Sequence, residues 1–189
     1  AFMHHPPFTK GSHNSDDTTG EDKRCTEIRT YIVPILEKYG VDLVMSGHSH
    51  SYERSYLTTG FSGFSKEYLD EPHIVGPQVS GDVTLGEPYY KNPDDAQYPN
   101  KGTVYTQVGC SGFIEKAVKW ASDTSNLITK QMMHISTNTN IGSLSIKINQ
   151  DTLSTVFIDK TGAIIDRYTI IKDNTKTITL NMSDKREKT

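Results

Sequence analysis

The chain has 189 residues, of which 34% are apolar and 23% are charged, and its formal net charge is -3. This composition suits one soluble globular domain with a core of ordinary size, and it offers no basic stripe that would favour nucleic acid as a structural partner. The longest apolar runs hold about five residues, far fewer than the roughly 20 that a membrane-spanning helix needs, so we expect no membrane span.

The start of the chain reads as the end of a buried strand, Ala1-Phe2-Met3, that opens directly into a loop. A natural amino terminus is rarely a core strand of this kind. We therefore expect the chain to be the carboxy-terminal part of a longer protein. Residues 4–20, called the first loop below, are rich in Pro, Gly, Ser, Thr and Asp and contain His4, His5 and His13. A loop of this length inside a compact domain usually has a function.

An amphipathic helix is predicted between Asp22 and Tyr39. Asp22 or Thr19 could cap its start, and Gly40 stands where a left-handed helix end is expected. Pro34 falls inside the pattern and removes one backbone donor, so we expect a kink or a helix in two pieces. The helical period rests on apolar residues that recur every three or four positions, namely Cys25, Ile28, Tyr31, Ile32, Ile35, Leu36 and Tyr39.

A short buried strand from Val41 to Met45 follows, and a turn with Gly47, His48 and His50 comes directly after it. Alternate residues of an extended segment point the same way, so we expect both imidazoles on one side, about 6–7 Å apart, where they could share one metal or bind two adjacent metals. The order strand, loop, helix, strand, turn indicates an α/β fold. Such folds place ligands at the carboxyl ends of their strands, so His4 is expected to meet the two turn histidines.

The remaining two thirds of the chain are read mainly as β-structure. Residues 56–101 are irregular, the segment 87–95 is expected to be a surface excursion, and His73 a surface histidine. Strands are predicted over 102–109, 142–148, 153–158 and 163–171, with a hairpin turn at 159–162. The polar tail 173–189 is expected to add an edge strand at Ile178 and Leu180 and then to be disordered. Cys25 and Cys110 are either two buried thiols or one disulfide.

Two segments together resemble the calcineurin-like metallophosphoesterases, and among these the purple acid phosphatases and their bacterial relatives. They are Met3-His4-His5-Pro6-Pro7-Phe8 and Gly47-His48-Ser49-His50-Ser51-Tyr52-Glu53-Arg54-Ser55. The likeness runs from residue 1 to about residue 172 and includes only the fourth and fifth motifs of the family. It implies that residues 1–172 are the carboxy-terminal part of a four-layer α/β/β/α sandwich.

The resemblance also implies roles for individual residues. His4 and His48 would bind the second metal and His50 the first, in a centre that holds iron with zinc, manganese or a second iron. His13 would bind the substrate phosphate and protonate the leaving alcohol, and His5 would line the same pocket. Tyr52, Glu53 and Arg54 are expected to be structural, forming an ion pair and packing contacts that orient the turn.

The function implied is hydrolysis of phosphate monoesters by a metal-activated hydroxide at a binuclear centre. Alternatives are a phosphodiesterase or nucleotidase of the same superfamily, and a non-catalytic metal-binding module. No Asp-x-His or Gly-Asn-His-Glu string occurs in the chain, so most metal ligands are expected outside it and the chain alone is predicted to be inactive. Its partners would be a small phosphate ester and the missing amino-terminal half of the domain. Secretion or export to the periplasm is expected, with any signal preceding Ala1.

Overall fold

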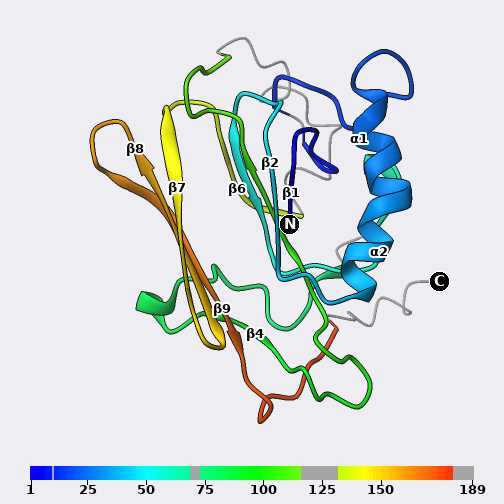
Figure 1. Cartoon of the computed structure of the whole chain (residues 1–189), viewed down its shortest axis with the longest axis vertical. Helices are drawn as coiled ribbons and strands as arrows, with labels where there is room; N and C mark the ends of the chain where they lie inside the picture. The colour runs from blue at the N-terminus through cyan, green and yellow to red at the C-terminus, as the bar shows by residue number, and fades with distance from the viewer. Residues whose placement is uncertain (10, 69–72, 116–131, 181–189) are drawn as a thin grey trace, which may run out of the picture.

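The protein consists of three layers: a helical segment, a five-stranded sheet and a four-stranded sheet (Figure 1). The computed structural model describes residues 1–9, 11–68, 73–115 and 132–180. The predicted α/β class is confirmed. Three of the four expected layers are seen in the described residues.

The five-stranded sheet contains the strands that lead into the histidine segments. Three neighbouring strands on one side of this sheet are parallel to one another. The two strands beyond them are each antiparallel to the strand before. Because β1 and β2 are parallel and Met3 pairs with Ser46, both strands end at the same edge of the sheet. The order is β1 (Phe2–Met3), β2 (Leu43–Ser46), β5 (Val104–Val108), β3 (Tyr52–Ser55) and β6 (Met133–Thr137).

The predicted helix between β1 and β2 is present in three pieces: α1 (Lys23–Glu27), the π-helical turn η1 (Ile28–Ile32) and α2 (Val33–Lys38). Pro34 lies in the first turn of α2, directly after the π-helical turn, as a residue without a backbone donor requires. Gly40 ends the segment with a φ of 69°, which confirms the predicted helix end. Asp22 stands at the predicted N-cap position of α1, but its side chain makes no capping bond.

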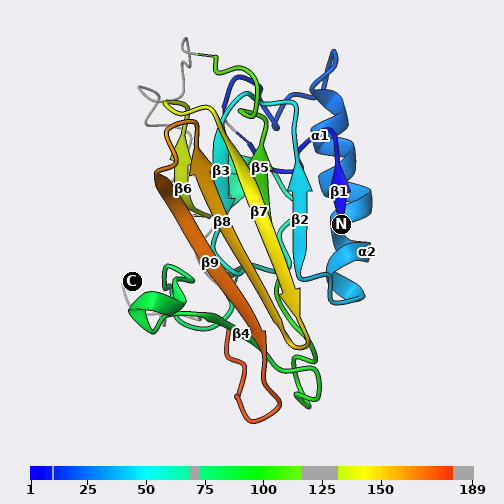
Figure 2. The same cartoon turned by 60° about the vertical axis from the view of Figure 1, so that its left-hand side comes forward.

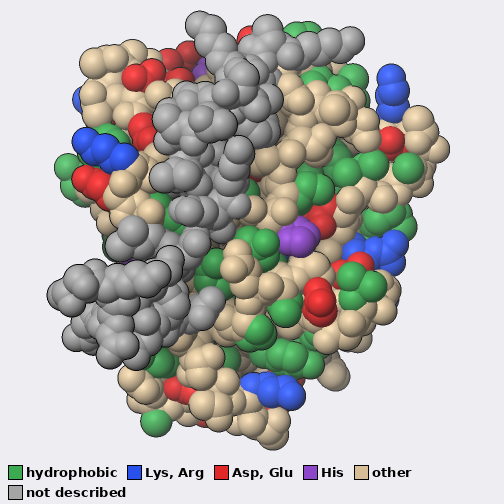
Figure 3. All heavy atoms as spheres, turned by 180° about the vertical axis from the view of Figure 1, so that it is seen from behind, with side chains coloured by type: hydrophobic (Ala, Val, Ile, Leu, Met, Phe, Trp, Pro, Cys, Tyr) green, Lys and Arg blue, Asp and Glu red, His purple; other side chains and the backbone are tan. Residues whose placement is uncertain are grey.

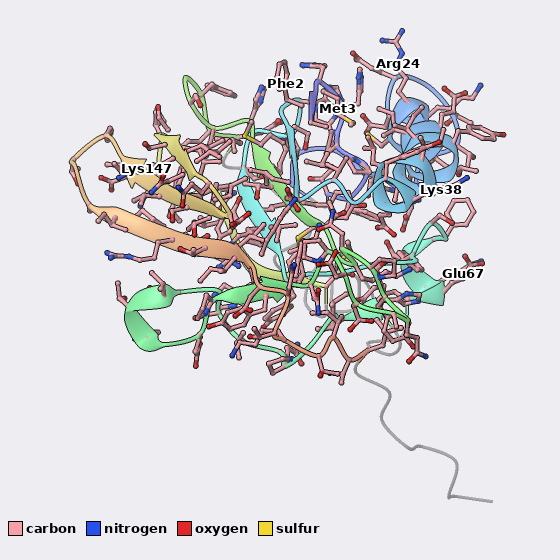
Figure 4. All side chains as sticks on the ribbon, turned by 60° about the horizontal axis from the view of Figure 1, so that its bottom comes forward. Phe2, Met3, Arg24, Lys38, Glu67 and Lys147 are labelled. Atoms are coloured by element: carbon pink, nitrogen blue, oxygen red, sulfur yellow. The ribbon has the colours of Figure 1, made fainter. Side chains whose placement is uncertain are left out.

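Only part of the predicted apolar face of this helix points inward. The buried side chains are Cys25, Arg29 and Val33, and Arg29 pairs with Asp16 at 3.0 Å. The expectation of a buried strand at 1–3 is wrong, because Ala1 is exposed, Met3 is only partly buried and Phe2 is 85% exposed (Figure 4). The apolar stripe of the helix is wider than the face that the sheet covers, and four of its predicted members are exposed: Tyr31, Ile32, Ile35 and Tyr39.

The four-stranded sheet faces the first one across a core (Figure 2). Its predicted meander is confirmed, including the turn at 159–162, where the Gly162 amide donates to the Asp159 carbonyl. The prediction of a surface excursion at 87–95 is wrong, because β4 pairs with β9 and Lys91 is fully buried. The order of its strands is β4 (Tyr89–Lys91), β9 (Ile164–Lys172), β8 (Thr152–Asp159) and β7 (Gly142–Asn149). Two short 3₁₀ turns, η2 (Ser65–Glu67) and η3 (Val83–Leu85), precede β4 in the chain.

The structure also bears on the predictions for the two cysteines, for His73 and for the tail. Cys25 and Cys110 are free, buried thiols, and burial raises the pKa of Cys25 to about 12 and that of Cys110 to about 11. His73 is half-buried, with its ring against Phe61 and Tyr68. Leu180 forms a single bridge to Val75, and the rest of the tail, from residue 181, lies outside the described residues.

Among the described residues, no helix has both the length and the apolar composition that crossing a bilayer requires. On the face shown in Figure 3, side chains of both charge signs are scattered among apolar ones. This agrees with the even charge balance of the sequence.

The two sheets are joined by a buried charge network centred on Arg54 of β3. Its guanidinium donates to Asp166 of β9 at 2.6 and 2.8 Å, to Tyr89 of β4 at 2.8 Å and to the Ser80 carbonyl at 2.9 Å. Tyr52 also donates to Asp166, at 2.6 Å. Burial acts to raise the pKa of Asp166, but the hydrogen bonds and charge of Arg54 outweigh it and hold the pKa below its usual value. The network therefore keeps Asp166 ionised inside the protein.

We predict that Arg54→Met destabilises the chain by about 3–5 kcal/mol, because it leaves the Asp166 carboxylate buried without its cation. Arg167→Met is the matched control. Arg167 lies beside Asp166 on β9, but its side chain is 37% exposed and 3.8 Å from Asp82, so its loss should cost about 1 kcal/mol or less. Urea denaturation measures both free energies of unfolding. Equal losses in the two variants would contradict the importance of the network.

Candidate metal centre

Four histidine rings gather at the edge where β1 and β2 end. His4 directly follows β1, and the Gly47 amide after β2 donates to the His4 carbonyl at 2.9 Å. The ring centroid of His48 lies 5.2 Å from that of His4, 4.3 Å from that of His5 and 3.7 Å from that of His13. The predicted convergence of His4 with the turn is therefore confirmed for His48.

The turn that presents His48 is strained and clamped. His48 has a φ of 69°, a left-handed conformation that is uncommon and costs free energy in a non-glycine residue. Gln107 of β5 holds this turn: its side-chain amide donates to the carbonyls of Gly47 and, at 2.5 Å, of Ser49, on either side of His48. Gly109 completes the clamp, because a Cβ there would stand 1.8 Å from the Ser49 carbonyl oxygen.

His50 does not join the other rings. The expectation of an extended backbone that places His48 and His50 on one side is wrong, since two tight turns bond Ser49 to Gly47 and Ser51 to Ser49 through their backbones. The His50 ring instead lies against Phe113, with centroids 5.1 Å apart, and its Nδ1 is 3.8 Å from Glu115.

Asp22 is the site residue that sequence reasoning missed. One of its carboxylate oxygens accepts from His13 Nδ1 at 2.8 Å and from His48 Nε2 at 3.0 Å, and the other accepts from the Asn14 amide at 3.0 Å. Burial acts to raise the pKa of Asp22, but these hydrogen bonds outweigh it and keep the pKa below its usual value. The available signal was a carboxylate at the end of a histidine-rich loop, which is a common partner for an imidazole.

These side chains form two overlapping sets of possible metal ligands within the described residues. One is His4, His5 and His48, the other His13, Asp22 and His48, and in each set the ligand atoms lie within 4.8 Å of one another. Burial, assisted by the nearby His48 and His4, lowers the pKa of His5, which favours the neutral imidazole that can bind a metal. The buried Nε2 of His5 has no hydrogen-bond partner in the described part of the chain. Imidazole and carboxylate donors suit zinc, iron and manganese, so the residues present fit a metal.

Successive side chains of β3 point to opposite faces of the strand. Tyr52 and Arg54 face the second sheet, where Arg54 forms an ion pair with Asp166. Glu53 faces the site side, where its carboxylate accepts from Thr9 of the first loop at 2.7 Å and from Ser51 at 2.7 Å. Glu53 therefore ties the first loop to the turn that carries His48.

Comparison with known proteins supports the fold. No family model matches the sequence, and no curated protein matches it. Among solved structures, the purple acid phosphatase PPD1 from seeds of yellow lupin (Lupinus luteus) is similar to this chain, with a TM-score of 0.51 and 15% sequence identity. The match covers 91% of this chain and 24% of that one. The chain thus spans about a quarter of the length of that phosphatase and has a fold like part of it.

We predict that Gln107→Leu destabilises the chain by about 1–3 kcal/mol, because the carbonyls of Gly47 and Ser49 lose their buried donor. Gln97→Leu is the control: Gln97 is exposed, so its replacement should change the free energy of unfolding by about 0.5 kcal/mol or less. Denaturant titration of both variants tests this. A Gln107 variant as stable as the Gln97 variant would show that the clamp contributes nothing.

Proposed function

We propose that this chain is the carboxy-terminal part of a metal-dependent phosphoesterase that hydrolyses phosphate monoesters. The observation that carries the proposal is the meeting of His4 and His48 at the ends of two adjacent parallel strands, with His13 beside them. The fold likeness to a purple acid phosphatase supports it. Export to the periplasm or out of the cell is part of the same proposal.

In this proposal His4 and His48 bind one ion and His50 binds the other, iron being paired with zinc, manganese or a second iron. Bound metals would polarise the phosphate and supply the nucleophile. Three imidazoles are too few ligands for two ions, so the remaining ligands come from another part of the domain. His50, whose ring lies against Phe113, is the residue assigned to the other ion. The chain by itself is then inactive.

His13 acts as the general acid in this scheme. Its Nδ1 is held by Asp22 at 2.8 Å and its side chain is 28% exposed, so Nε2 is the nitrogen left to carry a proton toward a substrate. Asp22 fixes the ring orientation, as a carboxylate does for a catalytic histidine. His5 stands beside His48 and borders the same pocket.

We predict that the full-length protein containing this chain hydrolyses a chromogenic phosphate monoester when loaded with iron, zinc or manganese. His48→Ala and His50→Ala should each lower kcat/KM by at least about 100-fold, because a ligand matters more than the outer partners whose loss costs 10–100-fold. His73→Gln is the control, since that ring contacts Phe61 and Tyr68 away from the site. Undiminished activity in either variant would refute the assignment of that histidine as a metal ligand. Hydrolysis by the 189-residue chain alone would refute the proposal that its active site lacks ligands from another part of the domain.

The acid role of His13 is tested by varying the leaving group in the same protein. His13→Ala should cost about 10²–10⁴-fold in kcat for esters of poorly acidic alcohols, which need a proton to depart. The loss should be much smaller for a nitrophenyl ester, whose leaving group departs unprotonated. Equal losses for both substrates would mean that His13 only binds the phosphate.

A further inference from the structure

We propose that His4, His5 and His48 form a three-imidazole site that holds one zinc-class cation without any residue from outside this chain. His5 is the new element of this site. Its role is that of a metal ligand. The two other histidines come from the ends of β1 and β2, so the site is built on the edge of the sheet.

The observation that points to a ligand is the buried, unsatisfied nitrogen of His5. The residue is 7% exposed, and its Nε2 has no hydrogen-bond partner among the described residues. The Glu21 carboxylate is 4.0 Å away, beyond hydrogen-bond reach, and is itself largely exposed. A buried polar atom without a partner is rare in native proteins, and an absent ion is one of its standard explanations.

The alternative set, His13, Asp22 and His48, lacks this feature. Its polar atoms already satisfy one another, because Asp22 accepts from His13 at 2.8 Å and from His48 Nε2 at 3.0 Å. When His48 donates Nε2–H to Asp22, its lone pair is on Nδ1. Asp22 then serves as the outer carboxylate that orients a metal-binding histidine, an arrangement common around zinc.

The donor set defines which cations would bind. Three neutral imidazoles without a carboxylate suit Zn²⁺, Co²⁺, Ni²⁺ and Cu²⁺, and disfavour Mg²⁺ and Ca²⁺, which need oxygen ligands. Three protein ligands leave one position of a tetrahedral ion open, as in catalytic zinc sites. His4 is exposed while His5 is buried, so an ion has a route from solvent to the site.

This inference shares His4 and His48 with the proposed function but does not depend on phosphate hydrolysis. The proposed function fails if the full-length protein has no phosphatase activity. The site fails if the chain alone does not bind metal through His5. The first is measured as phosphatase activity of the full-length protein, and the second as metal binding by the 189-residue chain, so the two outcomes can be distinguished.

The experiment is isothermal titration calorimetry of the 189-residue chain with Zn²⁺ and, in a separate titration, with Mg²⁺. We expect one Zn²⁺ per chain and no Mg²⁺ binding. His5→Gln and His5→Phe, the second of which keeps a flat ring against His48, should each weaken Zn²⁺ binding by at least about tenfold. The His73→Gln variant should bind Zn²⁺ with the same affinity as the unaltered chain. Circular dichroism checks that all variants are folded.

X-ray absorption of the unaltered, zinc-loaded chain tests the site even if the His5 variants fail to fold. Three imidazole nitrogens at about 2.0–2.1 Å are expected. A lack of 1:1 Zn²⁺ binding would overturn the proposal, as would fewer than three imidazoles. So would a large loss of affinity in His13→Gln with none in the His5 variants, because the ion would then occupy the other set.

Discussion

The buried pair of Arg54 with Asp166 is the interaction on which the rest of this structure depends. A guanidinium and a carboxylate in a protein interior are tolerated only if nearly every donor and acceptor is satisfied, and here Tyr52, Tyr89 and a backbone carbonyl complete the set. The pair fixes β3 of the first sheet against β9 of the second. Because β3 follows the turn that carries His48, the joint between the sheets also anchors the far end of that turn.

The alternation of side chains along β3 connects this anchoring to the proposed metal centre. Arg54 faces the second sheet, whereas Glu53 faces the opposite side and accepts from both the first loop and the turn. On the next strand, Gln107 clamps the carbonyls on either side of His48. The left-handed backbone of His48 is thus imposed by two adjacent strands, which places the ring before any metal binds. Preorganised ligands of this kind lose little entropy when they take up an ion.

Much of the fold follows from local pattern. The alternating residues of the final meander predicted three strands and their hairpin turn, and the helical period with Pro34 and Gly40 predicted an interrupted helix and its end. The convergence of His4 with His48 follows from parallel strands that end at one edge. These features depend on residues close in sequence, or on a topological rule that holds for most α/β sheets.

The remaining features depend on contacts between distant segments, which no local period encodes. Lys91 is buried in a parallel pairing because Asp42 and Gly40 from another segment satisfy its charge. Asp22 stands at the N-cap of α1 but makes no side-chain capping bond, because two imidazoles occupy its carboxylate. The backbone at His48 left the extended form because Gln107 holds both flanking carbonyls, and His50 lies apart. Residue types and spacing therefore determine which functional groups this chain carries. Tertiary packing decides which of its side chains meet, because hydrogen-bond partners and burial are properties of the folded whole.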